Sequence, residues 1–199
     1  EDKNVGTGKT VTTSGNLLLD NPIFLLFGEL PTYTGDITSR SLTVAATGVD
    51  KVYDATTAAS VTLAAASTVA AGTAGGGLIA GDQVSYSYTG AVFSGGKDAG
   101  TGKAIAVSGI GIAGLDVGNY TLANTTDSAT ANIDKVILSL AGLTGSKEYD
   151  RSTALTGASF TIDTSKVLGG EAVDGTTSGD ATFDTWHAGV GKVLTTDLS

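Results

Sequence analysis

The chain has 199 residues, a formal net charge of −9 and a pI near 4.3. Nucleic-acid binding depends on Lys and Arg that neutralise phosphates, so this charge argues against it. The absence of Cys excludes disulfides, thiolate catalysis and zinc–thiolate sites, and no stretch approaches the roughly 20 apolar residues of a spanning helix.

Glycine is abundant, with 29 residues against 2 prolines, and it is scattered between short apolar runs. The runs alternate with period two and are rich in β-branched residues, which predicts strands joined by tight turns. In chain order, the alternating residues are Leu42 and Val44, then Val84, Tyr86 and Tyr88, then Ile105 and Val107, then Val136, Leu138 and Leu140, then Phe160 and Ile162. The Ala-rich segment Val61–Ala71 has no clear helical stripe, and we expect strand and loop there, with a short helix as the alternative.

Two phrases repeat along the chain. Lys3-Asn-Val-Gly-Thr-Gly-Lys9 returns as Lys97-Asp-Ala-Gly-Thr-Gly-Lys103, at a spacing of 94 positions from Lys9 to Lys103, and more loosely as Ala188-Gly-Val-Gly-Lys192. Lys51-Val-Tyr-Asp54 returns as Lys147-Glu-Tyr-Asp150, at a spacing of 96 positions from Tyr53 to Tyr149. Two unrelated phrases at nearly one period predict an internal repeat.

The repeat divides the chain into three parts. We expect the second half of a module at 1–43, a complete module at 44–137 and the first half of a module at 138–199. Neither half can close a hydrophobic core alone. The order of the phrases, and a start without Met, favour a window cut from a longer array. The alternative is that another chain completes the outer modules by strand addition.

The predicted fold class is all-β. Several short antiparallel strands in a module of about 95 residues fit tandem β-sandwiches with Ig-like layering. A parallel β-helix or solenoid is the alternative, although no subperiod of about 20 to 30 residues is found inside the module.

Four separated phrases carry a family resemblance: Lys51–Ala58, Gly81–Val84 with Phe93, Lys97–Lys103 and Gly118–Leu122. In this order they resemble the YDG repeat domain of large bacterial exoproteins, many of them similar to filamentous-haemagglutinin-type adhesins exported by two-partner secretion. The resemblance implies an architectural role and brings no catalytic residues. The family's third letter is Gly, but Ala55 and Arg151 stand there, so we expect a turn that does not need positive φ.

The repeated residues are interpreted as structural. Gly100, Gly102 and Lys103 superficially look like a phosphate loop, but Ala104 follows the lysine and a strand pattern comes next, which favours a β-turn. Tyr53-Asp54 and Tyr149-Asp150 could form an acid/base pair. Adjacent strand residues point to opposite faces, however, so we expect Tyr at the edge of the core with its hydroxyl on backbone, and Asp closing a turn.

Other candidate sites are weaker. Tyr86, Tyr88 and Tyr120 are candidate exposed contacts for a glycan. Asn119 and Asn124 begin Asn-x-Thr sequons and are candidate glycosylation sites. The single His, His187, beside the single Trp, Trp186, does not make a metal or haem site by itself. Calcium at module junctions remains an alternative on loop carboxylates, although no Asp-x-Asp-x-Asp-Gly spacing is present; these carboxylates are Asp82, Asp98, Asp116, Asp127, Asp134, Asp163 and Asp180.

The sequence therefore predicts a non-catalytic structural repeat, a stalk or filament segment of an exported bacterial surface adhesin, without a cofactor and located outside the cell. Its expected partners are neighbouring modules or other copies of the chain, together with host or biofilm glycans, and not nucleic acid or a membrane interior. A glycan-binding module, and a self-assembling filament subunit completed by strand addition, are the alternatives. An enzyme would need a pocket of convergent carboxylates with one raised pKa.

Overall fold

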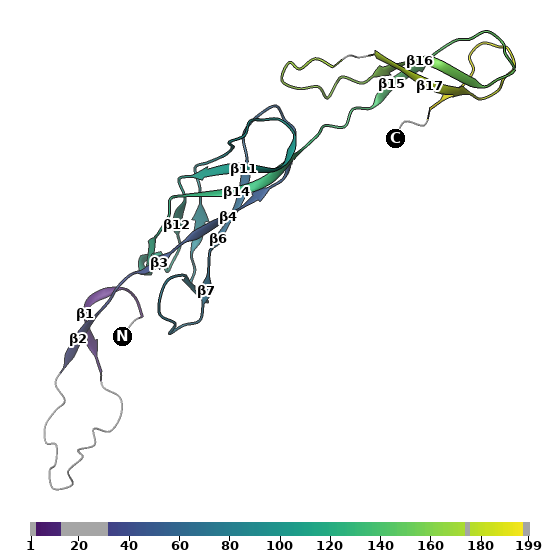
Figure 1. Cartoon of the computed structure of the whole chain (residues 1–199). Helices are drawn as coiled ribbons and strands as arrows, with labels where there is room; N and C mark the ends of the chain where they lie inside the picture. Colours follow the sequence, from purple (N-terminus) through teal and green to yellow (C-terminus); the bar gives the residue numbers. More distant parts are fainter. Residues whose placement is uncertain (1–2, 13–31, 174–175, 197–199) are drawn as a thin grey trace, which may run out of the picture. The chain divides into compact units, whose positions relative to one another are not determined.

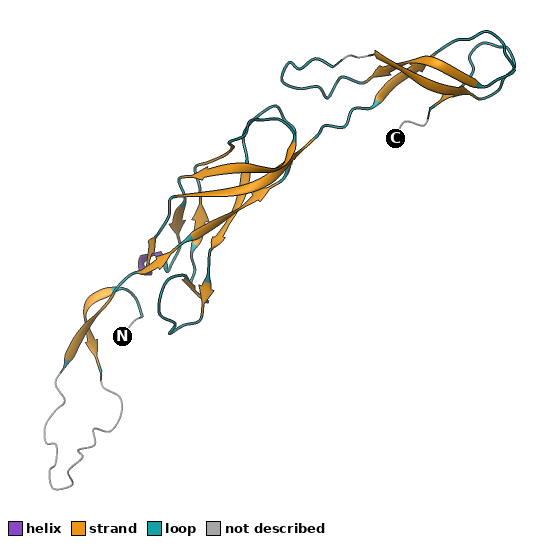
Figure 2. Cartoon of the chain, in the orientation of Figure 1, coloured by secondary structure: helices purple, strands orange, loops and turns teal. Residues whose placement is uncertain are grey.

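The computed structural model of the chain describes residues 3–12, 32–173 and 176–196. Within these ranges the structure is all-β, as the alternation predicts, and strands and loops fill it apart from one 3₁₀ turn, η1 (Val117–Asn119) (Figure 2). No helix in the described ranges is long and apolar enough to cross a membrane. The apolar stretch Leu17–Leu30 lies outside the described residues.

The chain divides into two compact units, and the labels of Figure 1 are used for both. Strands β11 (Gly100–Ser108) and β14 (Thr126–Asp134) contribute residues to both units. The other strands of the first unit are β1 (Gly6–Val11), β2 (Tyr33–Ile37), β3 (Arg40–Leu42), β4 (Val44–Val49), β6 (Ser60–Ala65), β7 (Thr68–Val69), β8 (Leu78–Ile79), β9 (Ser85–Ser87), β10 (Gly90–Phe93), β12 (Gly111–Ala113) and β13 (Tyr120–Leu122). The second unit holds β5 (Lys51–Val52), β15 (Leu140–Thr144), β16 (Ala154–Ile162), β17 (Thr176–Phe183) and β18 (Leu194–Thr195).

The first unit is built mostly from antiparallel pairs. These are β1 with β2, β4 with β6, β9 with β12, and β10 with β11, while β3 pairs in parallel with β13 and β7 with β8. Period-two alternation places one face of each strand in the core, because successive side chains point to opposite faces. The buried apolar residues are Leu42, Val44, Val61, Ala91, Phe93, Ile105, Val107, Ile110, Tyr120 and Ala131.

The second unit contains a four-stranded sheet in the order β15-β16-β17-β18, all antiparallel. Its core is a small cluster of Leu155, Ala158, Phe160 and Ala181, and the partly buried Leu143, Phe183 and Leu194 pack against it. In the same unit, β5 pairs in parallel with the end of β14.

Two local predictions can be compared with these strands. Val61–Ala71 forms β6, a loop and β7, so the expectation of strand and loop is confirmed. Val136–Leu140 was expected to be a strand, but β15 begins only at Leu140 and residues 135–139 carry no strand. Val136 and Leu138 instead line a surface hollow with Tyr53 and Lys166, so their alternation reflects side-chain packing without a ladder.

Candidate functional site

The phrase Lys51–Ala58 folds as a turn that is closed by its own side chains. Lys51 Nζ donates to Asp54 Oδ1 over 2.7 Å, and the Thr56 amide donates to the same oxygen over 2.9 Å. The lysine first, then the Thr56 amide and hydroxyl, lower the pKa of Asp54 to about 2. The predicted role of Asp54 in closing a turn is confirmed.

The second copy of this phrase repeats the same contacts. Lys147 Nζ lies 2.8 Å from Asp150 Oδ1, and the Ser152 amide donates to that oxygen over 2.9 Å. Lys147 is the main cause of a lowered pKa of Asp150. The turn is therefore a property of the phrase, since it forms in both modules from the same residue types.

The residue after each of these aspartates has a left-handed backbone. Ala55 has φ of 62° and Arg151 has φ of 61°, and no other non-glycine residue in the described ranges has positive φ. The expectation that the turn does not need positive φ is therefore wrong. A left-handed backbone is disfavoured because it brings Cβ close to the following carbonyl oxygen. The side-chain hydrogen bonds of the turn hold the backbone in this conformation despite that contact.

The glycine–lysine phrase forms a second turn, which is bonded to a neighbouring strand. Its last glycine has φ of 60° at Gly8, 58° at Gly102 and 68° at Gly191. The amide of Gly102 donates to Asn132 Oδ1 on β14 over 2.8 Å. Asn132 also donates from its own amide to Asp50 Oδ1 over 2.7 Å, and from its side chain to Asp50 Oδ2 over 3.0 Å. The Gly102 amide, which would have to bind a phosphate in a phosphate loop, is thus already bonded to Asn132.

The two phrases meet in space, at a place we call the motif corner: residues 51–58 with 97–103, and in the third module 147–154 with 186–192. In the middle module, Lys97 Nζ lies 5.0 Å from the centre of the Tyr53 ring and donates to the Tyr53 hydroxyl and to Glu171. The hydroxyl of Tyr53 in turn donates to Glu171. Its partners are thus side chains and not the backbone expected from the sequence.

These contacts also define the charge state of the corner. Glu171, and then the Tyr53 hydroxyl, raise the pKa of Lys97, while Lys97 and then Tyr53 lower the pKa of Glu171. Both groups are driven towards their charged forms, so neither is poised to exchange a proton near neutral pH. Lys97 and Glu171 thus form an ion pair that stabilises the motif corner, and their pKa shifts are not those of an acid/base pair.

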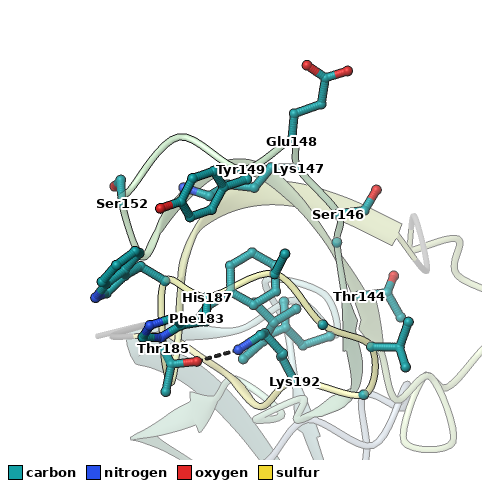
Figure 3. A pocket seen from close by; sticks show the side chains of 18 residues that line it. Thr144, Ser146, Lys147, Glu148, Tyr149, Ser152, Phe183, Thr185, His187 and Lys192 are labelled. Carbon is teal, nitrogen blue, oxygen red and sulfur yellow. Dashed lines mark hydrogen bonds between the residues drawn. The ribbon is translucent and has the colours of Figure 1, made fainter.

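In the third module Trp186 stands where Lys97 stands in the middle one, three residues before the first glycine of the phrase. The rings of Tyr149 and Trp186 lie 5.9 Å apart, and Trp186 stacks on His187 at 4.0 Å. Tyr149 and Trp186 are 54 % and 44 % exposed. They line a cavity of about 530 Å³ together with Phe183, Lys192 and Leu194 (Figure 3).

The tyrosines predicted to contact a glycan are mostly engaged by the fold. Tyr120 is only 7 % exposed, so its expected exposed position is wrong. Its hydroxyl donates to Asp82 Oδ2 over 2.7 Å and accepts from the Ile79 amide. Tyr86 and Tyr88 are half-buried; the Tyr86 hydroxyl is buried without a partner among the described residues, and that of Tyr88 accepts from the Val61 amide over 3.5 Å.

The two sequon asparagines also have structural partners. Asn124 bonds to both the amide and the carbonyl of Val44, each over 2.9 Å, and so bridges the chain as a peptide group does. Asn119 is less constrained, since its Oδ1 accepts from the Val5 amide and its Nδ2 donates to Asn4. A glycan on Asn124 would remove bonds that hold the start of β4 in place.

Two polar contacts were not predicted from the sequence. Arg40 donates to three carbonyls, those of Gly77, Thr73 and Gly76, over 2.7 to 2.8 Å. Lys3 Nζ lies 2.7 Å from Asp82 and 3.4 Å from Asp116, so two of the candidate calcium carboxylates have a lysine partner. The sequence signal for the cluster of Lys3, Asp82 and Tyr120 is the pair of phrases Gly81-Asp82 and Gly118-Asn-Tyr120, because Tyr120 donates a hydrogen bond to Asp82. In the described ranges, no group of three or more His, Cys, Asp or Glu could hold a metal.

A comparison with protein families matches residues 38–129, from just before β3 to within β14, to the YDG domain. Residues 38–129 are therefore a YDG domain. The motif corner includes two phrases that carry the resemblance of this YDG domain, and the Asp82–Tyr120 contact joins two others. No match was found among curated proteins or among solved structures.

Proposed function

We propose that the chain is a non-catalytic structural segment, a stalk of tandem YDG modules with Ig-like sandwich layering, from an exported bacterial surface adhesin. The observation that carries this proposal is the pairing of early with late strands within residues 40–134. Strand β3 pairs in parallel with β13, and β5 pairs in parallel with β14.

Parallel pairing of early with late strands suits a chain under tension. When a module is pulled from its two ends, the strands of such a pair slide along each other, so their hydrogen bonds are loaded together instead of one after another. The side-chain braces support the same role, because Lys51–Asp54 and Asn132–Asp50 tie the strand β5 and its flanks together. Five charged residues of the motif corner are used in ion pairs: Lys51, Asp54, Lys97, Lys147 and Asp150.

Force spectroscopy on the whole chain tests this proposal. We expect extension of the middle module to occur in one cooperative event at a force well above that of a hairpin that unzips. Weak, stepwise extension of the middle module would contradict the stalk function. Asn132→Ala is the matched variant, since it removes the side chain that joins β14 to Asp50 and should lower the unfolding force.

A second candidate function, a glycan-binding module, is favoured by one observation. Tyr149, Trp186 and His187 present exposed rings beside the cavity of the third module, with Trp186 stacked on His187 and tilted against Tyr149 (Figure 3). Aromatic faces of this kind bind the apolar faces of sugars. Because Trp186 is the single tryptophan of the chain, its fluorescence reports binding directly. A saturable shift with a glycan, lost in Trp186→Ala, would support this function over a purely structural one.

A further inference from the structure

The chain contains two ion pairs that join the same two phrases. In each of them, the first lysine of a Lys-x-x-Gly-Thr-Gly-Lys phrase contacts a carboxylate far along the chain, at a separation of 79 or 74 positions. Lys3 Nζ lies 2.7 Å from Asp82 Oδ1, and Lys97 Nζ contacts Glu171 Oε1. The first pair lies within the first compact unit and the second pair within the second. The same kind of contact therefore forms twice, each time inside one unit.

The two carboxylates occupy equivalent positions of the repeat. Gly81-Asp-Gln-Val84 returns as Gly170-Glu-Ala-Val173, so a phrase of glycine, an acidic residue, any residue and valine repeats after 89 positions. We call it the glycine–acid phrase. In both pairs it belongs to the module that follows the lysine, because Asp82 lies in the middle module and Glu171 in the third. Each ion pair therefore joins one module to the next.

The electrostatics agree at the two places. Asp82 is the main cause of a raised pKa of Lys3, and Lys3 is the main cause of a lowered pKa of Asp82. Lys97 and Glu171 shift the pKa of each other in the same two directions. All four groups are thus held in their charged forms. The change from aspartate to glutamate in the third module keeps the charge that the lysine contacts.

A hollow lies beside each ion pair, and equivalent residues line the two hollows. The first has a volume of about 600 Å³ and the second of about 310 Å³. Each is lined by an apolar residue of the lysine phrase, an apolar residue just before the glycine–acid phrase, and the carboxylate itself: Val5, Ile79 and Asp82 in the first, and Ala99, Leu168 and Glu171 in the second. Both the charged and the apolar positions of the contact are therefore repeated.

Neutral hydrogen bonds add to each ion pair, which matters because an exposed ion pair contributes little by itself. The side chains of Lys97 and Glu171 are 38 % and 44 % exposed, and the hydroxyl of Tyr53 also donates to Glu171. At the first pair, the Val5 amide donates to Asn119 Oδ1 of the middle module over 2.9 Å. The contact between consecutive modules thus consists of a charge and of directional hydrogen bonds at both places.

We propose that the Lys-x-x-Gly-Thr-Gly-Lys phrase of one module is the docking site for the module that follows, and that the carboxylate of the glycine–acid phrase is the group it binds. The phrase superficially looks like a phosphate loop, and it binds an anion through its first lysine while the Gly102 amide is bonded to Asn132. The partner is the next module of the same chain, because both contacts join consecutive modules. The inference rests on the proposed tandem array and adds how its modules are joined.

Distance distributions between two spin labels test this docking on the whole chain, which has no cysteine of its own. Thr62→Cys on β6 and Thr161→Cys on β16 provide exposed labelling positions in the middle and third modules. We expect a narrow distribution in this labelled chain. Lys97→Glu replaces attraction by repulsion and should raise the ratio of undocked to docked molecules about fivefold, which broadens the distribution.

The matched control is the same substitution at the other ion pair. Lys3→Glu changes the net charge equally and should leave the distribution between Thr62→Cys and Thr161→Cys unchanged. With labels at Thr34→Cys on β2 and Thr62→Cys, the roles are exchanged: Lys3→Glu should broaden the distribution and Lys97→Glu should not. If Lys97→Glu does not fold, as judged by circular dichroism, Lys97→Met removes the charge and keeps the apolar part of the side chain.

Charge exchange and salt complete the test. Lys97→Glu combined with Glu171→Lys restores the attraction and should narrow the distribution again. Raising NaCl from about 0.05 M to about 1 M should broaden the distribution of the parent chain and narrow that of Lys97→Glu, because screening weakens attraction and repulsion alike.

Three results overturn the docking site: a broad distribution in the parent chain, an unchanged distribution in the Lys97 variants, or equal broadening by Lys3→Glu and Lys97→Glu. A charge exchange that leaves the distribution broad overturns the carboxylate as the bound group. The labels report how folded modules are joined and not the force that unfolds the middle module, so the docking site and the stalk function fail independently.

Discussion

At the scale of single residues, the turns that follow Tyr53-Asp54 and Tyr149-Asp150 hold backbone strain at the next residue, Ala55 and Arg151. Ala55 and Arg151 occupy the position where the family has glycine, and both have φ near +60°. A left-handed residue with a Cβ costs about 1–2 kcal/mol, whereas glycine has no such cost. Glycine, the residue expected from the family resemblance, fits this backbone, whereas the chain has Ala55 in one copy and Arg151 in the other.

Ala55→Gly and Arg151→Gly are therefore expected to stabilise their modules. The relief of strain exceeds the added entropy of the unfolded glycine, so each should raise the free energy of unfolding by about 0.5–1 kcal/mol. Urea unfolding measures the change. Ala104→Gly, at an exposed position within β11, is the control and should be destabilising. Loss of stability in both turn variants would show that the Cβ contacts outweigh the strain.

The acidic limit of stability is a second residue-scale prediction. The pKa of Asp54 falls from its ordinary value of 3.8 to about 2 in the folded chain, mainly through Lys51. A depressed pKa stabilises the fold above the unfolded value, and this stabilisation is lost as pH falls through the folded value. Stability should thus decrease between about pH 4 and pH 2.

Asp54→Asn is the variant that tests this assignment. It should be less stable than the parent chain at pH 7 and should show a shallower loss of stability from pH 4 to pH 2, measured by urea midpoints at each pH. Asp180→Asn, on an exposed carboxylate of β17, is the matched control. An unchanged slope in Asp54→Asn would assign the acid transition to other carboxylates.

At the scale of elements, the strands were predictable from the sequence and their connections were not. Ile105 and Val107 alternate with exposed residues and are buried as expected, and the Ala-rich segment forms strand and loop. The convergence of Tyr53 with Lys97 could not be predicted, because alternation reports which face a residue occupies but not which strands are neighbours. Val136 and Leu138 show the opposite limit, because they alternate without belonging to a strand.

Asn132 is the residue on which the pairing of these elements can be tested. Its side chain accepts from the Gly102 amide and donates to Asp50, so it joins β11, β14 and the start of β5. Asn132→Ala removes these two side-chain bonds, whose partners Gly102 and Asp50 are exposed, and should cost about 0.5–1.5 kcal/mol in the free energy of unfolding. Ser128→Ala, on an exposed position of the same strand, should cost about 0.5 kcal/mol or less. Thermal unfolding compares the two, and equal costs would mean that the bridge contributes little.

At the scale of the whole molecule, the two units differ in the size of their cores. Ten apolar residues are buried in the described part of the first unit, whereas the sheet β15–β18 is supported by a cluster of four. Stability follows the apolar area removed from water, and regions with few buried contacts open first. We therefore expect the amides of β15–β18 to exchange with solvent faster than those of β4, β6 and β11.

Phe160→Ala tests this difference in core size, because it removes the largest side chain of the smaller core. Phe160 is 1 % exposed at the centre of the four-residue cluster, and truncation of a buried phenylalanine costs about 3–5 kcal/mol. Because so small a core cannot absorb that loss, β15–β18 should unfold while β4, β6 and β11 keep their protection, as seen by peptide-resolved hydrogen exchange. Trp186 gives an independent signal, since it lies in the third module. If Phe160→Ala accelerated exchange equally in β4 and β16, the two units would unfold as one cooperative body, and the third module would depend on the middle one for its stability.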